Sequence, residues 1–209
     1  MSLSDSQIEE LCKRMDIPLG DVLFKDEMND IEFNKAYFVN IQDSTDEDGQ
    51  ANQGTHWTLL QCRKYPNGSV ENIYFDPYGK GPPEEVKKLV LKYTNKALPY
   101  TKKDIQSLMN NACGFYCCAM AHFINASRYR TGSLYDDVET FLDMFDDLNT
   151  SIDFKKNEYI LKHFFRSEAP ELRKEIDVDT IVNDDSGGID VFKQPINLKI
   201  KKNGGWEEI

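Results

Sequence analysis

The sequence predicts an α+β protein, because strand-like segments dominate its first half and helical patterns its second. Residues 35–41 (KAYFVNI), 56–62 (HWTLLQC) and 70–75 (VENIYF) are rich in aromatic and β-branched side chains, which favour strands. A long segment at residues 113–127 (CGFYCCAMAHFINAS) is too evenly apolar for an exposed helix. We therefore expect a small sheet packed against a buried central helix, with further helices around both.

Caps, prolines and helical spacing predict the remaining elements. Residues 4–15 have the pattern of a short first helix that ends before Pro18 and Gly20. The turn-rich sequence YPNGS joins the last two expected strands as a hairpin. Further helices are expected over residues 82–97, 134–148 and 155–165.

The charge pattern divides the chain into two parts. Residues 1–167 contain these regular patterns and are expected to form one domain. Residues 168–209 are first acidic and then basic, which is typical of a tail or a weakly packed extension. The net charge of −11 argues against non-specific binding of nucleic acid, which depends on basic residues.

Composition also bears on the cellular context. No apolar run approaches the roughly 20 residues that a membrane-spanning helix needs, so we expect no membrane contact. The polar, acidic N-terminus (MSLSDSQIEEL) is neither a secretory signal nor a transit peptide. The five cysteines are therefore expected to be reduced, and no Cys/His spacing suits zinc or another metal.

Cys113 is the candidate nucleophile. It begins the apolar helix, where the partial positive charge and free N–H groups of a helix N-terminus lower a thiol pKa and can receive an oxyanion. Gly114, which follows, would leave room for substrate beside the sulfur. Cys117 and Cys118 lie one turn further along and are interpreted as core residues. A buried structural cysteine is the competing interpretation of Cys113 itself.

Three other residues could serve this thiol. His56 opens a strand directly after a loop, a usual position for a catalytic side chain. Asp76 ends the next strand, so pairing of the two strands would place it beside His56 to orient the imidazole, although a turn aspartate is an equally good interpretation. Gln106, seven residues before Cys113, could aim its NH₂ at the oxyanion, whereas a loop glutamine commonly faces water.

The order GTHW, YFDPYG, a glutamine and then ACGFYCC resembles the adenain-like viral cysteine proteases over roughly residues 3–165. The resemblance implies a papain-like fold in which a small mixed sheet packs against the helix that carries the cysteine. It also implies that Cys113 is the nucleophile and His56 the general base, and that Trp57 packs against the site. Asp76 would orient the base, where adenain has a glutamate.

By the same resemblance, Gln106 is the oxyanion donor. The implied activity is a thiol endopeptidase that cleaves capsid or core precursor proteins near small, glycine-containing sites during virion maturation. The source would be a virophage, a Maverick-type element or a related DNA virus, with the enzyme in the virion and in the cytoplasmic virus factory of the infected cell. Gly187-Gly188 and Gly204-Gly205 are candidate self-cleavage sites, with flexible turns as the alternative.

Two cofactors of adenain are not expected here. That enzyme is stimulated by DNA and by a peptide tethered through a disulfide, whereas this chain is acidic and has no cysteine between Cys62 and Cys113. We therefore expect no cofactor, and DNA binding is doubtful.

Two other functions remain open. Deconjugases of ubiquitin-like and SUMO-like modifiers share the HW, FD and Q…CG elements, but they usually have an aspartate before the nucleophile, where this chain has Ala112. A non-catalytic binding module with the same fold is the other alternative. It is disfavoured because all four positions that the chemistry needs are filled.

Overall fold

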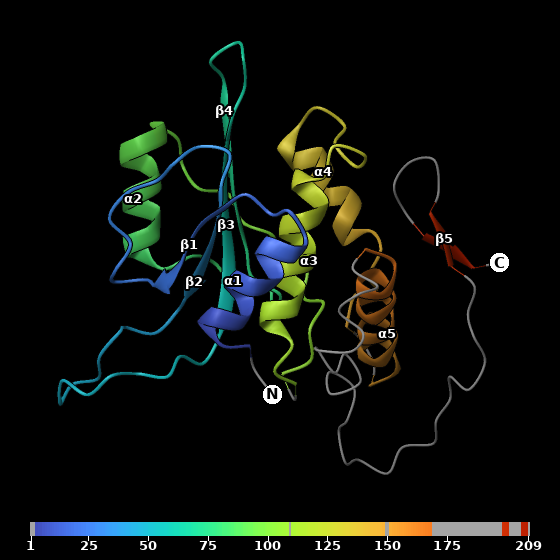
Figure 1. Ribbon diagram of the computed structural model, residues 1–209, viewed down its shortest axis with the longest axis horizontal. Coiled ribbons are helices and arrows are strands. Elements are labelled where there is room, and N and C mark those ends of the chain that lie inside the picture. Colours follow the sequence, from blue (N-terminus) through green and yellow to red (C-terminus); the bar gives the residue numbers. More distant parts are fainter. Residues whose placement is uncertain (1–2, 109, 149–150, 169–197, 201–205, 209) are drawn as a thin grey trace.

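The computed structural model describes residues 3–108, 110–148, 151–168, 198–200 and 206–208. A four-stranded mixed sheet with helices on both faces forms the main body (Figure 1), which confirms the α+β class. The strands of this sheet are β1 (Leu19–Phe24), β2 (Ala36–Asn40), β3 (Trp57–Lys64) and β4 (Val70–Phe75). The helices are α1 (Asp5–Arg14), α2 (Glu84–Thr94), α3 (Cys113–Asn125), α4 (Leu134–Leu142) and α5 (Ser151–Glu168). Two short antiparallel strands, β5 (Leu198–Ile200) and β6 (Trp206–Glu208), form a separate pair.

The strands lie in the order β1-β2-β3-β4, with β1 parallel to β2 and the other neighbours antiparallel. Strand β1 was not expected from the sequence, in which Gly20 was interpreted only as the end of the first helical pattern. The strand tolerates this glycine because the ring of Tyr37 occupies the place of a side chain, with ring atoms 2.5–2.8 Å from where a Cβ would be. The register also shifts between Leu19 and Asp21.

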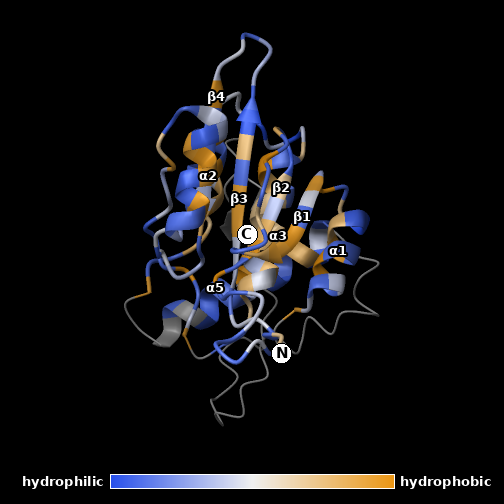
Figure 2. Cartoon of the chain, turned by 90° about the vertical axis from the view of Figure 1, so that its left-hand side faces the viewer, coloured by the Kyte–Doolittle hydropathy of each residue, from blue (hydrophilic) through white to orange (hydrophobic). Residues whose placement is uncertain are grey.

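The sheet separates two apolar clusters. Alternate residues of β3 show the division, because Leu59 packs with α1, α3, α4 and α5 while Leu60 packs with α2 on the other face. Figure 1 shows α2 on one side of the sheet and α3 with α4 on the other. Figure 2 shows apolar residues along the strands, and both polar and apolar residues along α2.

Helix α3 is buried along its length, as the sequence predicted. Every residue from Cys113 to Ile124 except His122 is buried, because β3, α1, α4 and α5 all contact this helix. Its N-cap residue, Ala112, makes no side-chain cap hydrogen bond. The N-terminal N–H groups are therefore not occupied by a cap side chain and face the site described below.

Several helix boundaries differ from the expectation. Helix α2 ends at Thr94 rather than at residue 97, α4 ends at Leu142 rather than at residue 148, and α5 spans Ser151–Glu168 rather than residues 155–165. The carboxylate of Glu168 contacts Arg128, accepts a hydrogen bond from the Tyr129 hydroxyl at 2.7 Å, and lies 3.0 Å from His122 Nε2. The packed body thus includes Glu168, one residue beyond the expected boundary at 167. The candidate self-cleavage pairs Gly187-Gly188 and Gly204-Gly205 lie outside the described residues.

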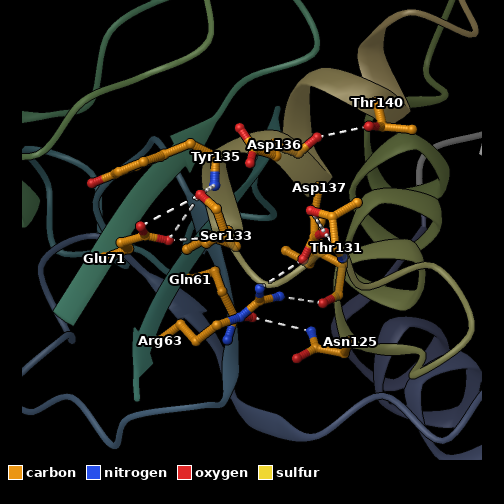
Figure 3. A network of polar contacts seen from close by, with 12 residues as sticks. Gln61, Arg63, Glu71, Asn125, Thr131, Ser133, Tyr135, Asp136, Asp137 and Thr140 are labelled. Atoms are coloured by element: carbon orange, nitrogen blue, oxygen red, sulfur yellow. Dashed lines mark hydrogen bonds and ion pairs between the residues drawn. The ribbon is translucent and has the colours of Figure 1, made fainter. Parts of the chain in front are cut away.

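A buried ion pair fastens the helical layer to the sheet (Figure 3). Arg63 on β3 donates to Asp137 on α4 at 2.6 Å, and a second guanidinium nitrogen donates to the Ile124 carbonyl of α3. Asp137 also accepts hydrogen bonds from the backbone N–H and the hydroxyl of Thr131. One side chain therefore links three elements. Of the helices that the structure describes, none has the length and apolarity to cross a membrane.

Candidate active site

His56 and Asp76 meet at one edge of the sheet. Because β3 and β4 are antiparallel, the start of β3 lies beside the end of β4, as the sequence predicted for these two residues. His56 Nε2 and Asp76 Oδ1 are 2.8 Å apart, and both side chains are buried. The same carboxylate oxygen accepts a hydrogen bond from the backbone N–H of Tyr78 at 2.8 Å. Asp76 thereby fixes the ring orientation and leaves Nδ1 as the nitrogen available to Cys113.

Cys113 joins this pair from the helical layer. It is the first residue of α3, and its Sγ accepts a hydrogen bond from the backbone N–H of Trp57 at 3.5 Å. Burial, the largest influence, raises the pKa of the Cys113 thiol. The hydrogen bond and charge of His56, with the N–H groups of Trp57 and Gly114, outweigh it and leave the pKa lowered. A thiol that is buried yet acidic is the form in which a cysteine acts as a nucleophile.

The imidazole shows the reciprocal shift. Burial is again the largest influence and lowers the pKa of His56, but hydrogen bonds and charges from Asp76 and Cys113 raise it overall to about 9. At neutral pH the two shifts together favour an imidazolium beside a thiolate. The two shifts therefore favour transfer of the proton from sulfur to nitrogen, which gives the thiolate that a cysteine nucleophile needs.

Three other cysteines have the opposite electrostatics. Burial raises the pKa of Cys117 and of Cys118 well above the usual value, and it raises the pKa of Cys62 to about 12. All five cysteines are free thiols. The interpretation of Cys117 and Cys118 as core residues agrees with their complete burial in the apolar cluster around α3.

Tyr78 is a site residue that the sequence reasoning missed. Its ring stacks on the His56 imidazole, and burial, together with the charges of Cys113 and Asp76, raises the pKa of its hydroxyl to about 12. The hydroxyl therefore stays protonated across the physiological range. The available signal was its position in YFDPYG, two residues after the orienting acid, on the same tight turn.

Gln106 is connected to His56 and Asp76 through Tyr78 and Pro77. The carbonyl of Pro77 accepts the backbone N–H groups of Ile105 and Gln106, so the DPYG turn and the glutamine loop are held together. The Gln106 Nε2 donates to the Tyr78 hydroxyl at 3.2 Å and to two oxygens of Asn110. The side chain is fully buried, so the alternative that it faces water is wrong.

The two predicted lining residues differ in outcome. Trp57 packs at the site as expected: it is buried, its backbone holds Cys113, and its indole N–H donates to the Leu3 carbonyl at 2.8 Å. The space beside Gly114 is not open for substrate. A Cβ at Gly114 would lie 3.1 Å from side-chain atoms of Leu3, so Leu3 occupies the space beside Gly114 that was expected to be open.

No protein-family model matches this chain, and no curated protein matches it either. A thiol of lowered pKa, an imidazole held by a carboxylate, and a helix N-terminus at the sulfur are the components of covalent acyl transfer.

Proposed function

We propose that this chain is a cysteine endopeptidase with a papain-like arrangement, similar to the adenain-like proteases. The observation that carries the proposal is the position of His56, which bonds to Asp76 through one nitrogen and lowers the pKa of Cys113 on its other side. The alternative is a structural cysteine, which needs no imidazole partner. Its pKa would be raised by burial, as happens for Cys117.

These contacts support the following mechanism. The Cys113 thiolate attacks the scissile carbonyl carbon, and the resulting oxyanion is received by the N–H of Cys113 and the NH₂ of Gln106. His56 passes its proton to the departing amine, which leaves an acyl-enzyme on sulfur. His56 then takes a proton from water as the water attacks the thioester, and the thiol is released with the carboxylic acid product.

The substrate class follows from the resemblance of GTHW, YFDPYG and ACGFYCC to the viral family. We propose viral capsid or core precursors as substrates, with cleavage beside glycine-containing sequences in the virion or the virus factory of the infected cell. Ala112, in place of the aspartate usual in modifier deconjugases, favours this substrate class.

The decisive experiment compares the purified full-length chain with Cys113→Ala and with Cys62→Ala, a matched buried cysteine on the α2 face. The substrates are a capsid precursor, peptides containing Gly-Gly, and precursors of ubiquitin-like and SUMO-like modifiers. We expect cleavage of the capsid precursor and the peptides, its loss in Cys113→Ala, and its retention in Cys62→Ala. Turnover of a modifier precursor alone would make the chain a deconjugase. Cleavage of these substrates by Cys113→Ala would refute the proposal.

Self-cleavage at the two glycine pairs is a separate outcome. The intact mass of active enzyme, followed over time beside Cys113→Ala, should fall by the segment beyond Gly188 or Gly205. An unchanged mass in enzyme that cleaves peptides would exclude this part of the proposal.

A further inference from the structure

Asn110 lies at the centre of the polar contacts that hold Gln106. Its carbonyl accepts the Gln106 Nε2 at 3.1 Å, and its Oδ1 accepts the same nitrogen at 2.8 Å and the backbone N–H of Ala112 at 3.2 Å. The Tyr78 hydroxyl also lies 3.4 Å from the Asn110 carbonyl, which it can donate to. The Asn110 amide therefore bonds both to Gln106 and to the backbone of Ala112, the residue directly before Cys113.

Helix α5 holds this loop at both ends through adjacent residues. Asn157, fully buried, donates to the carbonyl of Ile105 at 3.1 Å and to the carbonyl of Asp146 at 2.8 Å. Glu158, which is 5% exposed, accepts a hydrogen bond from Asn110 Nδ2. Asn157 and Glu158 are distinct from the residues proposed as nucleophile, base, orienting acid and oxyanion donor.

The chemistry of Glu158 decides which way the Asn110 amide points. An ionised carboxylate can only accept hydrogen bonds, so it selects the NH₂ end of the amide. The oxygen end is then left to receive Gln106 and Ala112. Without the carboxylate, a rotation of the amide by half a turn would present an NH₂ group to the Gln106 NH₂, and the two donors would repel each other.

We propose that Glu158 is a positioning residue for the proposed oxyanion donor: it orients the Asn110 amide, which in turn holds the Gln106 NH₂. The effect on catalysis rests on the proposed peptidase function, whereas the positioning itself does not. Glu158 touches neither substrate nor the reacting atoms, and it follows the nucleophile by 45 residues of sequence.

The first test follows the amides themselves in the full-length chain, by NMR of the side-chain NH₂ groups of Gln106 and Asn110. In Glu158→Ala we expect the Gln106 NH₂ protons to exchange with solvent at least about tenfold faster. Glu158→Gln should restore slow exchange, because its amide oxygen can still accept from Asn110. Ile160→Val, which removes one buried methyl group from the same helix, serves as the control and should leave the exchange unchanged. Equal exchange in Glu158→Ala and the wild type overturns the inference.

The second test separates positioning from general damage. Disulfide exchange of Cys113 with 2,2′-dipyridyl disulfide needs the thiolate but forms no oxyanion, whereas cleavage of a Gly-Gly peptide needs both. In Glu158→Ala we expect kcat to fall about 10- to 100-fold with disulfide exchange unchanged, and Gln106→Ala should show the same split to a larger extent. A parallel fall of both rates overturns the inference. A wild type that cleaves no peptide would instead refute the peptidase, and the NMR result would still decide the positioning.

Discussion

The ring of Tyr78 lies almost flat on the imidazole of His56, with the centroids 4.4 Å apart and the planes 15° from parallel. An imidazolium is attracted to the face of an aromatic ring by roughly 0.5–2 kcal/mol. The stack also prevents the imidazole from turning away from Asp76 and Cys113. Tyr78 therefore stabilises both the charge and the orientation of the base.

We expect Tyr78→Leu to lower the pKa of His56 by up to about one unit, since one unit corresponds to about 1.4 kcal/mol. Tyr78→Phe keeps the ring and should leave the pKa close to its value, although it removes the hydroxyl that accepts from Gln106. The alkaline limb of Cys113 alkylation by iodoacetamide measures this pKa. Identical limbs in the two variants would show that the ring stack contributes nothing.

Asp76→Asn should lower the pKa of His56 further, because it removes the hydrogen-bonded charge that raises this pKa to about 9. The folded pKa lies above the ordinary value of 6.5. Protonated His56 therefore stabilises the fold fully below about pH 6.5, and this contribution is lost as the pH rises through about 9. In Asp76→Asn the loss should occur at lower pH, both in urea unfolding and in the alkylation profile. Asp76→Glu, which keeps the charge, is the control and should stay near the wild type.

A thiol-reactive probe at mildly acidic pH should modify Cys113 faster than Cys62, Cys117 or Cys118. The pKa of Cys113 is lowered, while the pKa values of the other three thiols are raised by burial, so Cys113 has the largest thiolate fraction of these four. Peptide mapping by mass spectrometry identifies the modified residue. Labelling of Cys62 at a comparable rate would mean that Cys113 is not activated.

Gly79→Ala should damage the site, while Gly68→Ala should only reduce stability. Both glycines have positive φ angles, +65° and +83°, which cost a side chain about 1–2 kcal/mol. A Cβ at Gly79 would also lie 2.5 Å from the backbone oxygen of Lys102, whereas nothing lies within 4 Å at Gly68. We therefore expect Gly79→Ala to separate the DPYG turn from the Gln106 loop, with a larger loss in urea unfolding and slower peptide cleavage. Equal effects of the two changes would contradict this.

Breaking the pair of Arg63 with Asp137 should cost about 3–5 kcal/mol, because a buried charge is left without its partner. Asp137→Leu alone should show this loss in urea unfolding. Adding Arg63→Met should recover most of it, since both charges are then gone. If the double variant is as unstable as the single one, the loss comes from the Thr131 contacts of Asp137 instead.

The pairing of His56 with Asp76 was one of two equal interpretations of the sequence, because antiparallel pairing of the two strands would bring these residues together, and the structure confirms that pairing. The burial of helix α3 could also be predicted from the sequence, because a helix that is apolar all round has to be buried on all sides. Strand β1 was not predicted, because Gly20 is explained only by its contact with the ring of Tyr37, and the local sequence does not show that contact.

The residues that hold the site in place could not be predicted from the sequence, for a related reason. Tyr78, Asn110 and Glu158 are ordinary polar or aromatic residues whose roles depend on contacts between distant segments. Leu3 filled the space beside Gly114 in the same way, because nothing in its local pattern shows where the N-terminus lies. Local patterns thus predicted the candidate catalytic groups, while the groups that hold them in place required the tertiary structure.

The base and the nucleophile belong to different layers of the molecule, the first to the edge of the sheet and the second to the helix packed against it. A chain in which the layers have not yet docked carries an ordinary, weakly reactive thiol. The contacts that lower the pKa of Cys113 therefore form only when the two layers meet during folding. The rate of thiol labelling during refolding would report the moment at which the two layers close.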